Sequence, residues 1–319
     1  MVNVERTTVV LTHWGIEPGW LKIPDVATVE DPKYAEIIAT YMDHLLNTRN
    51  YTCIKYFIMV NEPNLEVKDW HRWKTGVQNV SAAFTRKMLA GKIALMGSDL
   101  SSGDEWHRNA VDQLKDALGA YDIHRYAPED EAESGALCSY CKTNWAYALT
   151  NDPTAKDKPF IVGEAGFFSP GFSAGNNPLH LDPRYAVLMS EYAVQTVNAG
   201  SWAVLAWMLD DNSHQGFTWG MWKNRTEGLA PKPWFYTWSL LSRCFRPGTR
   251  IVEAKVASAD VRVLAACADN KNSTGEHPWT FCIVNRADAP AKAHRCSAAG
   301  FGEPPWLRLK HGYCIISCG

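Results

Sequence analysis

The sequence predicts an α/β fold built on a parallel sheet, followed by a small antiparallel β domain. Two observations lead to this expectation. Six short apolar runs alternate with longer segments whose apolar residues recur at helical spacing, an order typical of parallel strands joined by helical crossovers. After residue 248 the helical spacing stops, and strand-like segments lie between Gly, Pro and Asn residues. We therefore expect two domains, at residues 1–248 and 249–319.

The six runs are almost continuously apolar, as expected for strands that are buried on both faces of a sheet. They lie at residues 7–14, 56–61, 92–99, 121–126, 159–164 and 202–209. Helices are expected between and after these runs, at residues 33–48, 76–90, 107–118, 142–150, 184–199 and 233–246. The helix near residue 184 has clear end signals, because Asp182 and Pro183 suit its start and Gly200 suits its end.

The C-terminal segment has β character. Arg246-Pro247-Gly248 breaks the last helix of the first domain. Four strand-like stretches follow, near residues 250–257, 260–268, 279–286 and 312–317. Short strands separated by turn residues are typical of an antiparallel, sandwich-like β domain.

Composition and charge exclude several classes of function. The 319 residues are 46% hydrophobic and 21% charged, with a formal net charge of −2. This balance gives no basic surface of the kind that binds nucleic acid. No run approaches the about 18 apolar residues of a membrane-spanning helix, so we expect no membrane partner. Residues 1–6 lack the features of a signal peptide, so the protein is expected to be cytoplasmic unless an export signal precedes Met1.

The nine cysteines leave the redox compartment open. Five of them lie in the last 53 residues, a density that disulfides in an oxidising compartment would explain. Cys138 and Cys141 form a Cys-x-x-Cys pair without a clear second pair. A surface disulfide or two thiols is therefore a better interpretation of this pair than a zinc or redox site.

Two glutamates stand at the carboxyl ends of predicted strands. Glu62 follows the run that ends in Asn61, and Glu164 follows the run Phe160-Ile-Val-Gly. In a (β/α)₈ barrel the carboxyl ends of the strands converge on the active site, so both side chains would face one cleft. One such acid is more often a surface or helix-cap residue, but two in this context suit glycoside hydrolysis. That reaction needs one carboxylic acid to protonate the leaving oxygen and one carboxylate to attack or to activate water.

With these motifs, Asn61-Glu62-Pro63 and Gly163-Glu164-Ala-Gly166, the chain resembles the clan of retaining (β/α)₈ glycoside hydrolases. That clan carries its acid/base on strand four and its nucleophile on strand seven. Within it the sequence is most similar to the cellulase-like family 5, over roughly residues 7–248. The resemblance implies a TIM-barrel fold with Glu62 as the acid/base and Glu164 as the nucleophile. The first apolar run would then be strand three.

The resemblance also implies a barrel that is N-terminally incomplete in this sequence. Only six residues precede the first run, so strands one and two have no counterpart, nor does the family's strand-two arginine. Six strands do not close the usual eight-stranded barrel, because strand number and tilt are linked.

Further residues match the positions that the clan uses to bind its sugar. His13 corresponds to an active-site histidine on strand three, and Asn61 would hydrogen-bond the sugar 2-hydroxyl. Asp122, His124 and Tyr126 alternate on one face of strand six, where the family keeps a histidine and a tyrosine beside the nucleophile. The remaining candidates would stack on sugar faces, and they are Trp207 on strand eight and Trp219 and Trp222 in the loop after it. No metal or organic cofactor is required.

Two other interpretations stay open. A non-catalytic carbohydrate-binding protein could retain the aromatic cleft of such a barrel. A metal-dependent hydrolase on the same fold would need clustered His and Asp residues at strand ends, for which the candidates are His13, Asp99, His124 and Asp210. The default substrate is a β-linked glycan or glycoside. The sequence leaves open which sugar and linkage are used, whether action is endo or exo, and the oligomeric state.

Overall fold

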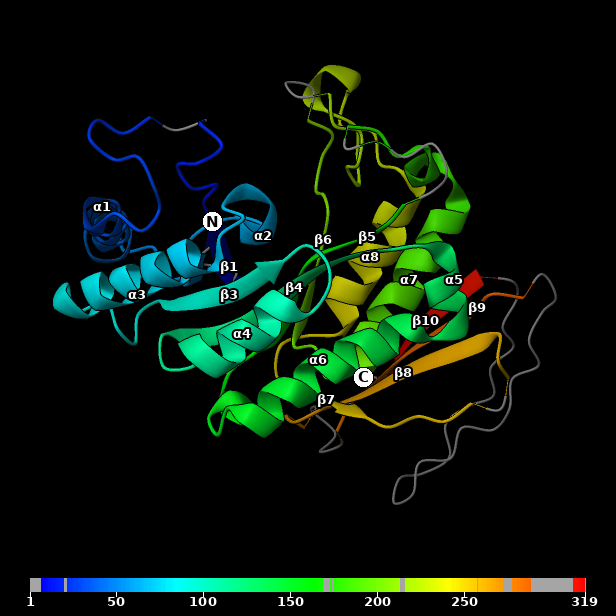
Figure 1. Ribbon diagram of the computed structural model, residues 1–319. Helices are drawn as coiled ribbons and strands as arrows, with labels where there is room; N and C mark the ends of the chain where they lie inside the picture. Colours follow the sequence, from blue (N-terminus) through cyan, green and yellow to red (C-terminus); the bar gives the residue numbers. More distant parts are fainter. Residues whose placement is uncertain are drawn as a thin grey trace. The chain divides into compact units, whose positions relative to one another are not determined.

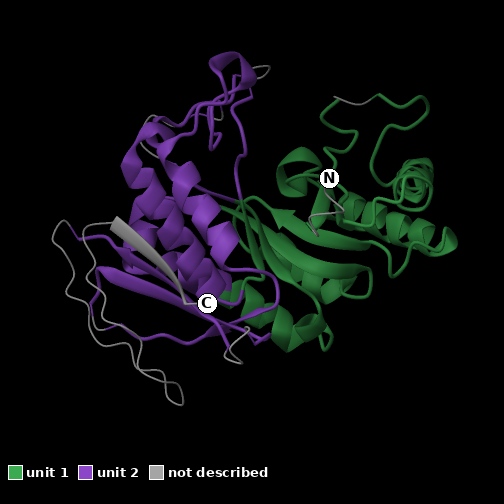
Figure 2. Ribbon diagram, turned by 180° about the vertical axis from the view of Figure 1, so that it is seen from behind, with its two compact units in different colours: residues 1–125, 142–164, 201–205 green, residues 126–141, 165–200, 206–319 purple. Residues whose placement is uncertain are grey.

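The computed structural model describes residues 7–19, 22–168, 173, 175–212, 216–256, 258–271, 277–287 and 312–318, the last of these as backbone only. The chain divides into two compact units, which Figure 2 shows in different colours. Unit 1 comprises residues 1–125, 142–164 and 201–205. Unit 2 comprises residues 126–141, 165–200 and 206–319.

A six-stranded parallel sheet curls into part of a (β/α)₈-type barrel, as the sequence predicts. The strand order β1-β2-β3-β4-β5-β6 follows the chain, and helices connect the strands (Figure 1). Each strand falls within or overlaps one predicted run. The strands are β1 (Val9–Thr12), β2 (Ile54–Ile58), β3 (Ala94–Leu100), β4 (Leu118–Ala127), β5 (Phe160–Phe167) and β6 (Ala203–Ala206).

Each predicted helix has a counterpart near its expected place, whereas the short helices Pro63–Glu66 and Glu129–Ser134 were not predicted. The helices are α1 (Pro32–Asp43), which continues into a π-helical turn (His44–Thr48), α2 (Pro63–Glu66), α3 (Trp70–Arg86), α4 (Glu105–Leu114), α5 (Glu129–Ser134), α6 (Ala136–Asn151), α7 (Pro183–Asn198) and α8 (Pro233–Cys244). Short 3₁₀ turns lie at Ala155–Asp157, Pro178–Leu181 and Arg225–Glu227. The side chains of Asp31, Asp69 and Asp182 accept backbone N–H bonds at the starts of α1, α3 and α7.

One layer of apolar side chains crosses the parallel sheet. Four neighbouring strands each contribute one buried side chain to it, and these are Ile58, Met96, Ala120 and Ile161. Val10 of β1 and Ala203 of β6 pack against this cluster. This cluster therefore joins all six strands of the sheet in one apolar layer.

Strand β2 ends at Ile58, three residues earlier than the sequence predicts. The chain turns away because Glu62 has a left-handed backbone with φ of 44°, and Pro63 then starts α2. The apolar residues Met59 and Val60 are buried all the same, so their hydrophobicity reflects core packing outside the strand.

A four-stranded antiparallel sheet lies in unit 2, in the order β10-β9-β8-β7. Its strands are β7 (Thr249–Val252), β8 (Val261–Ala268), β9 (Trp279–Asn285) and β10 (Gly312–Cys318). Their apolar face packs on α7 and α8, through a cluster that includes Val194, Leu241, Leu264 and Val284. Unit 2 thus combines this sheet with helices that precede residue 248. The domain division at residue 248 stays a prediction.

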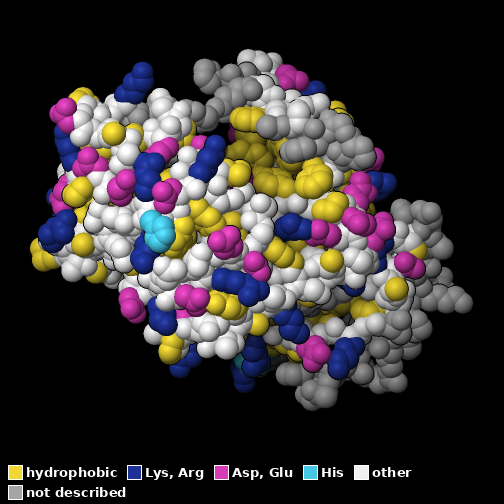
Figure 3. Space-filling view, viewed as in Figure 1, with side chains coloured by type: hydrophobic (Ala, Val, Ile, Leu, Met, Phe, Trp, Pro, Cys, Tyr) yellow, Lys and Arg dark blue, Asp and Glu magenta, His cyan; other side chains and the backbone are white. Residues whose placement is uncertain are grey.

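Among the described residues, no helix is both long and apolar enough to cross a membrane. On the face seen in Figure 3, basic and acidic side chains are interspersed, in line with a net charge near zero.

Candidate active site

Glu62 and Glu164 meet at His124 in unit 1. Glu62 follows β2, Glu164 lies in β5, and His124 lies in β4 between them. Nδ1 of His124 is 3.1 Å from Oε1 of Glu62 and 3.5 Å from Oε2 of Glu164. A carboxylate oxygen of each glutamate lies within 4.8 Å of one of the other. The two side chains are 20% and 13% exposed, so solvent reaches both.

A third acid holds the other edge of the His124 ring. Nε2 of His124 lies 2.8 Å from Oδ1 of Asp99, at the end of β3. The other oxygen of Asp99 accepts the backbone N–H of Glu62 at 2.9 Å. Asp99 therefore orients both the imidazole ring and the backbone that carries Glu62.

Asp122 lies behind this pair, buried to 0% exposure. Its Oδ1 accepts the backbone N–H of Asp99 at 3.0 Å, and its Oδ2 has no hydrogen-bond partner among the described residues. Gly163 of the neighbouring strand makes room for it, because a Cβ there would lie 2.9 Å from Oδ2 of Asp122. The inner residues of the site thus fill the space between β3, β4 and β5.

The charges of this cluster are unevenly distributed. Burial and the negative charge of Asp99 raise the pKa of Asp122 well above its usual value. Burial alone would raise the pKa of Asp99, but the charge and hydrogen bond of His124 outweigh it and lower that pKa. Burial alone would lower the pKa of His124, but the charges of Asp99 and Glu164 outweigh it and raise that pKa well above its usual value. These directions favour a protonated Asp122, an ionised Asp99 and an imidazolium at His124.

Two groups of residues bring possible metal-ligand atoms within 4.8 Å of one another. One is Glu62, His124 and Glu164, and the other is Asp99, Asp122 and His124. Both would need a lone pair on a ring nitrogen of His124, whereas each nitrogen faces a carboxylate oxygen that only accepts hydrogen bonds when ionised. A doubly protonated ring suits these partners better than a metal-bound one, and the absence of a required metal stays a prediction.

His13 and Asn61 lie beside each other in unit 1. The backbone N–H of Asn61 donates to the carbonyl of His13 at 2.7 Å. Nδ1 of His13 accepts the N–H of Gly15 at 2.9 Å and lies 2.8 Å from the hydroxyl of Tyr34. Burial lowers the pKa of His13, so the ring is neutral with its proton on Nε2. This leaves Nε2–H as a donor, which suits a sugar hydroxyl.

The other four predicted site residues lie in unit 2. Tyr126 and Trp219 are in edge-to-face contact, with ring centroids 5.4 Å apart. Trp219 is 2% exposed and also contacts His180 edge to face. The ring of Trp222 packs edge to face on Phe235, and Trp207 is partly exposed after β6. The sugar-binding roles of these four residues stay predictions.

Asp99 and Asp122 are the residues that the sequence interpretation left out of the site. Asp99 was considered there only as a metal ligand, and Asp122 only for its place on a strand face. Asp99 ends a predicted strand, so the argument that selected Glu62 and Glu164 applies to it as well. No local pattern marks Asp122, because its importance comes from burial against Asp99 and Gly163.

No protein-family model and no curated protein sequence matches this chain. Its structure, however, resembles solved glycoside hydrolases. A β-porphyranase of glycoside hydrolase family 86 from Bacteroides plebeius matches with a TM-score of 0.60 at 12% identity, over 97% of this chain and 61% of that one. A GH39 β-xylosidase from Caulobacter crescentus matches with a TM-score of 0.56 at 14% identity, over 83% of this chain and 54% of that one.

A third match is the catalytic domain of the GH30 xylanase C from Talaromyces cellulolyticus, with a TM-score of 0.52 at 14% identity. It covers 81% of this chain and 56% of that one. The chain thus spans between 54% and 61% of the length of these three proteins. At such low identity the likeness concerns the fold: this chain has the barrel-type fold of these glycoside hydrolases.

Proposed function

We propose that this chain carries the active site of a retaining glycoside hydrolase of the clan that its motifs resemble. The observation that carries the proposal is the meeting of Glu62 and Glu164 at His124, with carboxylate oxygens within 4.8 Å of one another. Retaining enzymes hold their two carboxyl groups about 5–5.5 Å apart, whereas inverting enzymes leave about 6.5–9.5 Å for a water molecule. The short separation favours the retaining reaction.

Glu164 is the proposed nucleophile and Glu62 the acid/base. In the first step Glu62 gives its proton to the glycosidic oxygen as the bond to the anomeric carbon breaks, and a Glu164 oxygen bonds to that carbon. In the second step Glu62, now a carboxylate, takes a proton from water. The water oxygen bonds to the anomeric carbon, and Glu164 leaves as a carboxylate.

The substrate class is a β-linked glycan or glycoside. The xylosidase, xylanase and porphyranase that share the fold favour such a substrate. Asn61 and the Nε2–H of His13 are the proposed hydroxyl-binding groups, and the backbone contact between these two residues and the neutral ring of His13 support this. The finer assignment to the cellulase-like family 5 stays a prediction from the sequence motifs.

A panel of aryl β-glycosides tests the proposal. The parent chain is expected to release the aryl alcohol with retention at the anomeric carbon, which NMR of the first product shows. Glu164→Gln removes the attacking oxygen and is expected to lower kcat at least about 10³-fold. Glu62→Gln is expected to lower kcat about 10²- to 10⁴-fold on glycosides with poor leaving groups. The loss is expected to be much smaller on dinitrophenyl glycosides, because dinitrophenolate leaves without a proton.

Glu105→Gln is the matched control, because Glu105 is exposed at the start of α4 and is not part of the proposed site. Its activity is expected to stay within about twofold of the parent. Turnover by Glu164→Gln at the parent rate contradicts the assignment. Binding of glycans without any turnover by the parent would favour the non-catalytic carbohydrate-binding protein instead.

A further inference from the structure

The ring of His124 is held by acids on both edges. Nε2 lies 2.8 Å from Asp99, and Nδ1 lies 3.1 Å from Glu62 and 3.5 Å from Glu164. The ring side chain is only 2% exposed, so water does not replace these partners. An imidazole with a carboxylate at each nitrogen satisfies both only when both nitrogens carry protons.

Asp99 and Asp122 differ in what they face, although both are buried. Asp99 accepts from Nε2 of His124 and from the backbone N–H of Glu62. Asp122 accepts only the backbone N–H of Asp99 among the described residues, and its second oxygen has no partner there. A buried carboxylate is tolerated when it is paired and hydrogen-bonded, and otherwise it takes up a proton. The contacts therefore place the negative charge on Asp99.

We propose that Asp99 is a positioning residue that keeps His124 doubly protonated, so that Nδ1–H of His124 donates to whichever of Glu62 and Glu164 is ionised. This proposal rests on the proposed function. It gives the site a buried cation within unit 1, supplied by a histidine with an acid behind it.

The arrangement suits both steps of the reaction. Before the first step Glu164 is the carboxylate and Glu62 holds the proton, so Nδ1–H donates to Glu164. Formation of the glycosyl ester removes the charge from Glu164 and leaves it on Glu62, which then receives the same N–H. The two oxygens differ by only 0.4 Å in their distance from Nδ1 (3.5 − 3.1), so a small tilt of the ring serves both. His124 keeps both of its protons throughout, and the only proton that moves is the one on Glu62.

Nitrogen NMR of the full chain, with ¹⁵N-labelled histidine, measures the protonation state directly. The His124 signals are assigned by their loss in His124→Gln. Both ring nitrogens are expected to remain those of an imidazolium from about pH 5 to about pH 8, beyond the usual range of histidine. The charged groups that face this ring from the packed strands are Asp99, Asp122, Glu62 and Glu164. A ring with a single proton at pH 7 overturns the proposal.

Asp99→Asn and Asp122→Asn form a matched pair. Asp99→Asn removes the charge that the ring needs, so His124 is expected to become neutral above about pH 6.5. The kcat/KM is then expected to fall about 10²-fold, and its pH profile is expected to show a new decrease on the alkaline side. Asp122→Asn replaces a neutral acid by a neutral amide, so the imidazolium signals and the shape of the pH profile are expected to persist. Equal changes in both spectra would contradict the placement of charge on Asp99.

These outcomes separate the two proposals. If no glycoside is hydrolysed but His124 stays an imidazolium that depends on Asp99, the proposed function fails while the charge assignment holds. If glycosides are hydrolysed but His124 is neutral, the proposed function stands and this inference is wrong. A purely structural role of Asp99 would lower the melting temperature in Asp99→Asn and leave the protonation of His124 unchanged.

Discussion

Gly163 lets strand β5 pass close to the buried acid and ring of the site. A Cβ at this position would lie 2.9 Å from Oδ2 of Asp122 and 3.2 Å from Cδ2 of His124. Such distances are shorter than side chains accept without moving. The absence of a side chain at residue 163 therefore allows Glu164, the next residue, to reach His124.

Gly163→Ala is expected to displace His124 and so to weaken its contacts with both glutamates. We expect a loss of kcat of about 10-fold or more, together with a loss in the free energy of unfolding of about 1–3 kcal/mol. Glycoside turnover and urea denaturation measure the two effects.

Gly119→Ala provides the control, because its Cβ would lie 2.6 Å from Cβ of Ala94 in the same sheet, with no contact to His124. It is expected to lower the free energy of unfolding to a similar extent and to leave kcat within about threefold once the protein is folded. A loss of kcat as large as that of Gly163→Ala would show that general crowding of the sheet accounts for the effect.

The position of strand-end acids was predictable from the sequence, but their surroundings were not. Glu62 and Glu164 were recognisable because each follows a buried apolar run, and residues at such ends converge on one face of the sheet. The raised pKa of Asp122 depends on burial and on the charge of Asp99, which lies on another strand, and Gly163 of β5 packs closely against it. Contacts between strands of this kind leave no local pattern in the sequence.

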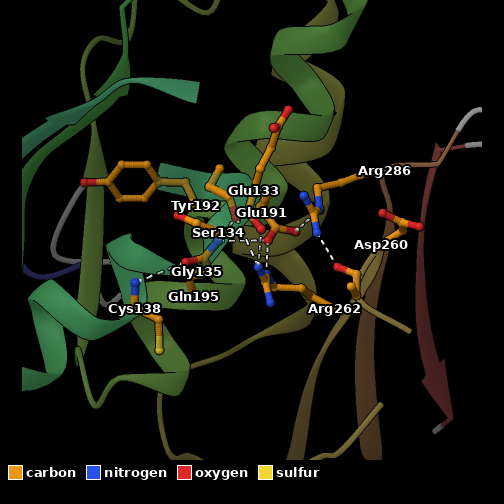
Figure 4. A network of polar contacts seen from close by, with 12 residues as sticks. Glu133, Ser134, Gly135, Cys138, Glu191, Tyr192, Gln195, Asp260, Arg262 and Arg286 are labelled. Atoms are coloured by element: carbon orange, nitrogen blue, oxygen red, sulfur yellow. Dashed lines mark hydrogen bonds and ion pairs between the residues drawn. The ribbon is translucent and has the colours of Figure 1, made fainter. Parts of the chain in front are cut away.

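At the level of elements, a buried ion pair fastens helix α7 to strand β8 (Figure 4). Glu191 of α7 is 0% exposed and pairs with Arg262 of β8. Arg262 also donates to the carbonyls of Ala132 and Glu133, at 3.2 and 3.0 Å. Gln195, one turn after Glu191, donates to it at 2.8 Å. One arginine thus connects α5, α7 and the antiparallel sheet.

Arg262→Met is expected to lower the free energy of unfolding by about 3 kcal/mol, because it removes the cation hydrogen-bonded to the buried carboxylate of Glu191 and leaves only Arg286, 3.8 Å away. Burial already raises the pKa of Glu191 against the charge of Arg262, so the loss of stability relative to the parent is expected to be smaller at pH 5 than at pH 8. Urea denaturation at both pH values measures these effects.

The double variant Arg262→Met, Glu191→Gln tests the cause. An uncharged amide in place of the carboxylate is expected to recover more than half of the loss, since the penalty comes from the buried charge that Arg262 no longer balances. If the double variant is no more stable than Arg262→Met, the loss comes from the carbonyl contacts of Arg262 instead.

The elements themselves were largely predictable, because each has signals within its own segment. Strand runs are apolar, and α7 begins with an aspartate whose side chain accepts an N–H bond, as its sequence indicates. Element ends were less predictable where the chain stays apolar beyond a strand, as at Met59 and Val60 after β2. Hydrophobicity reports burial there, while the left-handed backbone of Glu62 sets the turn.

At the scale of the whole molecule, both compact units bury a neutral histidine. His107 of unit 1 is 0% exposed, and burial lowers its pKa to about 4. His180 of unit 2 is also 0% exposed, and burial together with the charge of Lys232 lowers its pKa to about 3. The ring of His180 lies among Tyr185, Trp219 and Trp234, which offer no charge to stabilise a proton.

These histidines are expected to make both units lose stability in acid. Their pKa values in the folded state lie below the ordinary value of about 6.5, so the unfolded chain takes up protons first as the pH falls. Their stabilising contribution is complete above about pH 6.5 and is lost between about pH 6.5 and the folded pKa values. For His107 the loss amounts to about 3 kcal/mol by pH 4. The melting temperature is therefore expected to fall steeply as the pH is lowered across this range.

His107→Gln tests the assignment. Nε2 of His107 lies 3.0 Å from the carbonyl of Asn144, and a glutamine amide can donate the same bond without ever gaining a proton. The variant is therefore expected to lose less melting temperature between about pH 6.5 and pH 4 than the parent does. His71→Gln, at an exposed position on α3, serves as the control, and its melting temperature is expected to change with pH as that of the parent does. If the melting temperature of His107→Gln falls with pH as steeply as that of the parent, protonation of His107 does not cause the loss of stability in acid. The buried neutral ring is then not the group that limits stability.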